Sequence, residues 1–95
     1  MKSVTFDASV LRQLRALDRG ERGVAGKAIQ LAQEVFGQPH RHTGPGVRKL
    51  RGDFYELRIG LGRRLVFENA PETLHFVLFG DHRAGRDDLL RRPRQ

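Results

Sequence analysis

The chain has 95 residues, of which 38% are hydrophobic and 31% charged, and its formal net charge is +7. A chain of this length forms one domain with one modest core, so residues 1–95 are expected to be a single domain. Cysteine is absent, which excludes disulfides and thiolate metal sites. The sequence has neither an apolar run of membrane-spanning length nor the apolar core of a signal peptide. We therefore expect a cytoplasmic protein that binds polyanions, either nucleic acid or an acidic protein, and no membrane.

The first part of the chain predicts a short strand at residues 4–6 and then a helix over residues 8–17. Asp7 or Ser9 is expected to cap this helix, because such side chains accept hydrogen bonds from first-turn N–H groups. Its apolar residues recur at helical spacing and predict one buried stripe. They are Val10, Leu11, Leu14 and Leu17.

A second helix is expected over residues 21–36, after a break at residues 18–20. Its expected buried residues are Val24, Ala28, Leu31, Ala32 and Val35. Gly37 is expected to end the helix, and the Gly- and Pro-rich residues 37–46 form a loop. This loop holds two histidines with no carboxylate or cysteine beside them, so we expect no metal site there.

Residues 47–67 predict three strands joined by turns at residues 52–53 and 60–62. Apolar and charged residues alternate, as in a strand that is buried on one face only. One face receives Tyr55, Leu57 and Ile59, and the other receives Phe54, Glu56 and Arg58. Residues 74–79 are apolar apart from His75 and predict a central strand, and residues 86–92 predict a short helix.

This order of elements predicts an α+β fold, in which a two-helix hairpin packs on one face of a mostly antiparallel, twisted sheet of four to five strands. A short C-terminal helix completes it. The opposite face of the sheet carries many Arg and Lys side chains. We interpret this cationic face as the functional surface of the protein.

Four segments follow one another along the chain: Arg-Lys-Leu-Arg-Gly at 48–52, Tyr-Glu-Leu-Arg-Ile at 55–59, Arg-Leu-Val-Phe at 64–67, and a strand that ends in Gly-Asp-His at 80–82. This series, with the helices before it, resembles the RelE/ParE superfamily of toxins from bacterial type II toxin–antitoxin systems. The resemblance covers nearly the whole chain and implies a compact α+β fold with a basic cleft on its sheet. Members like RelE, HigB and YafQ cut mRNA, mostly at the ribosome, whereas members like ParE poison DNA gyrase. Each is neutralised by an antitoxin, usually through an acidic or amphipathic segment.

The resemblance also implies roles for individual residues. Arg64 stands where the ribonucleases keep an Arg that contacts the scissile phosphate, and Arg58 stands where a strand Lys or Arg activates or stabilises. His82 falls where the last strand supplies an Arg or His near the cleavage point. Glu56 occupies a position that is basic in some relatives. The C-terminal Tyr or Phe of the family is missing from this sequence.

Metal-free RNA cleavage uses the 2′-hydroxyl as the nucleophile and needs a base, an acid and cations around the phosphorane. Arg58 and Arg64 suit charge stabilisation, because donors aimed at developing charge contribute strongly to catalysis. His82 and Glu56 are the candidates for proton transfer. His82 is the better one, since a His titrates near neutral pH and neighbouring arginines favour the ionised form of a carboxyl group.

Four further cations are expected to hold phosphates outside the reaction centre, without reading sequence. They are Arg48, Lys49, Arg51 and Arg83. No cofactor or metal is expected. The expected partners are mRNA, the ribosome and a cognate antitoxin.

Three other hypotheses remain open. Arg58 and Arg64 would form only a surface ladder if they pair with Glu56 and Glu68, each pair contributing less than about 1 kcal/mol. The chain would be a gyrase inhibitor of the ParE kind if it has no catalysis of its own, which the missing aromatic favours. It would be a non-catalytic antitoxin-binding module if it has lost toxicity.

Overall fold

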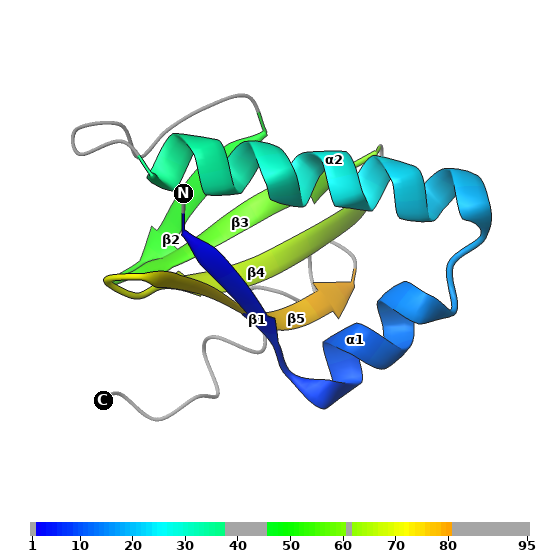
Figure 1. Cartoon of the computed structure of the whole chain (residues 1–95), viewed down its shortest axis with the longest axis horizontal. Coiled ribbons are helices and arrows are strands. Elements are labelled where there is room, and N and C mark those ends of the chain that lie inside the picture. The colour runs from blue at the N-terminus through cyan, green and yellow to red at the C-terminus, as the bar shows by residue number, and fades with distance from the viewer. Residues whose placement is uncertain (1, 38–45, 61, 81–95) are drawn as a thin grey trace.

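The computed structural model describes residues 2–37, 46–60 and 62–80, which form two helices and one five-stranded sheet (Figure 1). The elements in chain order are β1 (Ser3–Phe6), α1 (Ala8–Arg15), α2 (Arg19–Phe36), β2 (Val47–Arg51), β3 (Phe54–Ile59), β4 (Arg63–Asn69) and β5 (Thr73–Gly80). The strand order is β1-β5-β4-β3-β2, with β1 parallel to β5 and every other pair antiparallel. The expected α+β class and mostly antiparallel sheet are confirmed. The C-terminal helix expected at 86–92 and most of the loop at 37–46 lie outside the described residues.

The start of α1 is tied to the sheet by a side-chain network. Asp7 occupies the N-cap position of α1, but its side chain makes no cap hydrogen bond. Its carboxylate accepts instead from Nε2 of His75 on β5 at 2.7 Å, and Nδ1 of the same ring lies 2.5 Å from the Thr5 hydroxyl on β1. The expected capping by the Asp7 side chain is therefore wrong, because that carboxylate joins α1 to two strands.

The first turn of α2 is closed by a capping box, so the helix begins at Arg19 rather than at the expected Glu21. The Asp18 carboxylate accepts from the Glu21 N–H at 2.8 Å, and the Asp18 N–H donates to the Glu21 carboxylate at 3.4 Å. The hydrogen bond from the Glu21 backbone lowers the pKa of Asp18 from its ordinary value of 3.8. Glu21 also accepts from Arg63 at 2.7 Å, which joins this turn to β4.

The buried face of α2 is rotated from the expected one. The residues it buries are Ala25, Ile29, Ala32, Val35 and Phe36. The expected Val24 and Leu31 are instead 49% and 39% exposed. Both sets have helical spacing, and the sheet selects the one that buries the larger Ile29 and Phe36 side chains.

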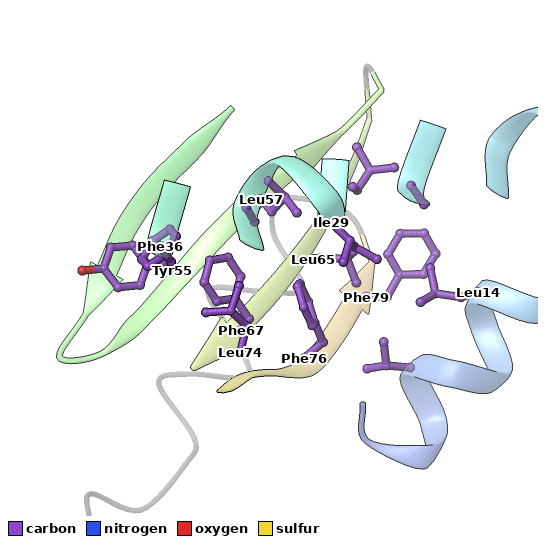
Figure 2. Close-up of a cluster of buried hydrophobic side chains, with 14 of the residues drawn as sticks. Leu14, Ile29, Phe36, Tyr55, Leu57, Leu65, Phe67, Leu74, Phe76 and Phe79 are labelled. Carbon is purple, nitrogen blue, oxygen red and sulfur yellow. The ribbon is translucent and has the colours of Figure 1, made fainter. Parts of the chain in front are cut away.

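One core lies between the helices and the sheet (Figure 2). Phe36 meets Tyr55 and Phe67 edge-on, with ring centroids 4.8 and 5.3 Å away, and Phe67 packs on Phe76 at 5.1 Å. The helices share this face of the sheet, but α1 packs mainly on β5 and α2 mainly on β3. They therefore resemble two separate supports more than the expected hairpin.

The other face of the sheet is not uniformly cationic. Val66 and Val77 are buried there, and Leu50, Phe54 and Leu78 pack against them. The expected cationic face is therefore wrong for the middle of the sheet, because β4 and β5 place apolar residues there. Among the described residues, arginines on this face lie close together where β3 ends and β4 begins.

Candidate nucleic-acid interface

A concave pocket of about 450 Å³ lies on this second face of the sheet. Its lining comes from three strands and from the residue before β2: Gly46, Val47, Arg48, Glu56, Arg58 and Arg64. Three arginines and one glutamate give this lining a formal charge of +2. The pocket is therefore suited to an anion, and its arginines carry the fork of donors that fits a phosphate group.

Arg58 and Arg64 are brought together by strand register. They are paired residues of β3 and β4, and directly opposed side chains on one face have Cβ atoms about 5 Å apart. Arg58 is exposed, and its side chain forms no hydrogen bond or ion pair with any residue that the structure describes. Its guanidinium is thus available to a ligand.

Arg64 is held more firmly than Arg58. Its Nε donates to Oε1 of Glu56 at 3.2 Å, and its Nη1 donates to the Arg63 carbonyl at 3.1 Å. Both members of the ion pair are largely enclosed, with the Arg64 side chain 14% and the Glu56 side chain 6% exposed. The pairing expected in a surface ladder is thus found for Arg64 with Glu56, but this pair is enclosed rather than on the surface, and Arg58 has no such pair among the described residues.

Three of the four further cations expected to bind phosphate lie on β2. Arg48 is the register partner of Glu56, which puts it on the pocket face. Lys49 is opposite Tyr55, whose side chain lies in the core, so Lys49 belongs to the helix-covered face. Arg51 pairs with Phe54, four residues before Arg58 and therefore about 13 Å away along the strand. Of these three, only Arg48 lines the pocket.

His82 and Arg83 lie outside the described residues, as do the two histidines of the loop at 37–46. Within the residues that are described, no three carboxylate or histidine side chains come together as metal ligands. In that same part of the chain, neither helix has the length and apolar character to cross a membrane.

The sequence matches no protein-family model and no curated protein. Solved structures are similar to it. The isolated E. coli RelE toxin superposes with a TM-score of 0.64 at 20% identity, over 96% of this chain and 98% of that chain. The chain has the RelE-type toxin fold.

Two structures of complexes are similar to the same extent. A chain of the YoeB–YefM complex from Staphylococcus aureus gives a TM-score of 0.64 at 17% identity, over 86% of this chain and 98% of that chain. A chain of the RelB–RelE antitoxin–toxin complex from Methanococcus jannaschii gives 0.62 at 16% identity, over 88% and 96%. The RelE/ParE resemblance of the sequence is thereby confirmed at the level of the fold.

Two pocket residues of this RelE-type fold, Gly46 and Val47, were not expected from the sequence. Gly46 precedes β2, and its carbonyl accepts from the Arg58 N–H at 2.8 Å. Its φ of 80° lies in the left-handed region, which glycine adopts without strain. A Cβ there would lie 3.5 Å from Cβ of Arg58. The only sequence signal was a glycine directly before a predicted strand, which also fits an ordinary turn.

Proposed function

We propose that the chain is the toxin of a type II toxin–antitoxin pair and cleaves mRNA as a metal-independent endoribonuclease, with the ribosome presenting the substrate. The observation that carries this proposal is the pairing of Arg58 with Arg64 in one arginine-lined pocket. The RelE-type fold and the sequence resemblance supply the reaction class. An mRNA-cleaving toxin acts in the cytoplasm.

In this proposal, the scissile phosphate lies between Arg58 and Arg64. Attack by the 2′-hydroxyl builds negative charge on the phosphorane oxygens, which preorganised guanidinium groups stabilise more than they stabilise the ground state. Arg48, which also lines the pocket, holds a neighbouring phosphate. Arg51 and Arg83 are proposed to contact the RNA backbone farther away, whereas Lys49 lies on the helix-covered face and would reach RNA only around the edge strand β2. Proton transfer is assigned to His82, with Glu56 as the second candidate.

RNA end mapping in a translating extract tests the reaction. We expect cleavage within messages, with 2′,3′-cyclic phosphate ends that report attack by the 2′-hydroxyl. Arg64→Ala should reduce cleavage by roughly 100-fold, the loss typical of one charge-stabilising donor. Lys27→Gln, a change of an exposed cation on α2, should leave cleavage intact. DNA damage with intact mRNA would instead identify a gyrase inhibitor and overturn the proposal.

The proposed partner is an antitoxin with an acidic or amphipathic segment. The formal charge of +7 favours an acidic ligand, and two similar structures are complexes that contain RelB or YefM. Co-expression with the product of the adjacent reading frame should restore growth and yield a complex that purifies as one species. Growth arrest that no neighbouring product relieves would contradict this partner.

A further inference from the structure

The Arg64 guanidinium is anchored on two of its three nitrogens. Nε donates to Glu56 and Nη1 donates to the Arg63 carbonyl. A guanidinium has five N–H donors, so three remain, two of them on Nη2. Nη2 has no hydrogen-bond partner among the described residues, and Arg64 lines the pocket. The two anchors therefore fix the plane of the group while its free donors remain for a ligand.

Glu56 is built into the sheet as a rigid anchor. It lies in the middle of β3, between register partners Arg48 on β2 and Val66 on β4, and it is 5% exposed. A carboxylate in this setting has little rotational freedom, so its bond to Nε defines where Arg64 points. Binding a phosphate then costs less side-chain entropy than it would with a freely rotating arginine.

We propose that Glu56 is a positioning residue, which holds Arg64 by its Nε so that the outer N–H groups face a phosphodiester in the pocket. This inference rests on the proposed function and changes the role expected for Glu56 from proton transfer to orientation. It differs from a counter-ion role, in which Glu56 and phosphate would compete for Arg64. The two roles predict opposite effects of removing the carboxylate.

A matched pair of variants separates these roles. Glu56→Gln removes the charge but keeps an oxygen that accepts from Nε, whereas Glu56→Met removes both at similar volume. The probe is a 2′-O-methyl RNA oligonucleotide, which binds but lacks the nucleophile. We expect Glu56→Gln to bind as tightly as the parent or more tightly. Glu56→Met should bind roughly threefold to tenfold more weakly than Glu56→Gln, the effect of one unordered side chain.

The same comparison in an Arg64→Ala background tests whether Glu56 acts through Arg64. There the Gln and Met variants should bind equally. The positioning role would be overturned if Glu56→Met still bound the oligonucleotide more weakly than Glu56→Gln in the Arg64→Ala background. It would also be overturned if the two variants bound equally in the presence of Arg64. Cleavage by Glu56→Gln distinguishes the proton-transfer role, because loss of a general acid or base costs roughly 100-fold or more. We expect this variant to keep its cleavage rate. A loss of that size in Glu56→Gln, with unchanged binding of the oligonucleotide, would assign Glu56 to proton transfer and overturn positioning.

A measurement without RNA keeps the inference separate from the proposed function. Nitrogen-15 NMR of the free protein should show a protected Arg64 Nε–H signal in the parent and in Glu56→Gln, and its loss in Glu56→Met. Thermal unfolding of each variant confirms that it folds. If the signal behaves so but no RNA binds, the proposed function is wrong and the anchoring is right. If the signal is unprotected in the parent, the positioning role is wrong.

Discussion

Arg58 of β3 and Arg64 of β4 are directly opposed across neighbouring strands, and only Arg64 is paired with a carboxylate of the described residues. Like charges that face one another on a sheet destabilise the folded state. The arrangement therefore places Arg58 beside a like charge with no carboxylate partner of its own among the described residues, which folding does not favour. Such a conflict is typical of a site kept for binding rather than for stability.

Removing the Arg58 charge should stabilise the protein while weakening RNA binding. We expect Arg58→Gln to raise the free energy of unfolding by about 0.2–1 kcal/mol, the range for relieving an opposed like-charge pair. Urea unfolding and RNA titration measure the two effects. Lys27→Gln is the matched control, because it removes an exposed cation from α2, and both quantities should stay unchanged. A fall in stability for Arg58→Gln would contradict the repulsion.

The binding of single-stranded RNA should depend on salt in proportion to the arginines that contact phosphate. Three arginines line the pocket. Three phosphate contacts in the pocket contribute about −2 to the slope of the logarithm of affinity against the logarithm of salt concentration, and contacts outside the pocket would add to it. Arg48→Gln should reduce the magnitude of that slope by about 0.7. An unchanged slope would remove Arg48 from the set of phosphate contacts.

Local patterns predicted the strands well. Alternation along 54–59 placed Tyr55, Leu57 and Ile59 in the core, because successive side chains of a strand point to opposite faces whatever lies around them. The same pattern put Glu56 and Arg58 on the pocket face. Strand period is a property of the backbone, so the sequence alone was sufficient here.

Tertiary packing decided what the patterns left ambiguous. Two apolar sets on α2 had helical spacing, and only contact with the sheet selected the one containing Ile29. The Arg64–Glu56 bond needs the register of β3 with β4 and the burial of Glu56, neither of which follows from composition. The sequence does carry a signal for the cap at Asp18, because Asp followed three residues later by Glu is typical of a capping box, although the helix was expected to begin at Glu21.

Acid should weaken the N-terminal cap of α2. The pKa of Asp18 is lowered in the folded protein, mainly by the hydrogen bond from the Glu21 backbone. A lowered pKa means that the ionised carboxylate is favoured by folding, so its contribution is full above the ordinary value of 3.8 and is lost as pH falls through the lowered value. Asp18→Asn keeps an acceptor that does not titrate. The stability of the parent relative to Asp18→Asn should therefore be constant above about pH 5 and fall below it. A pH-independent difference would rule out the carboxylate cap.

Replacing Gly46 with alanine should destabilise the protein, whereas the same change at Gly23 should not. Ala at position 46 must adopt a φ near the observed 80°, and the left-handed region costs an L-residue about 1–2 kcal/mol. Its Cβ would make only ordinary contact with Arg58 at 3.5 Å, so backbone strain is the main term. Gly23 lies within α2 with open space around an added Cβ, and Ala there should stabilise the helix by about 0.5–1 kcal/mol. The free energy of unfolding, measured with denaturant, should thus fall for Gly46→Ala and rise for Gly23→Ala.

The same two variants should differ in RNA binding. Because the Gly46 carbonyl accepts from the Arg58 N–H, only Gly46→Ala should weaken RNA binding. Equal RNA affinity in both variants would contradict a role for this turn in holding Arg58.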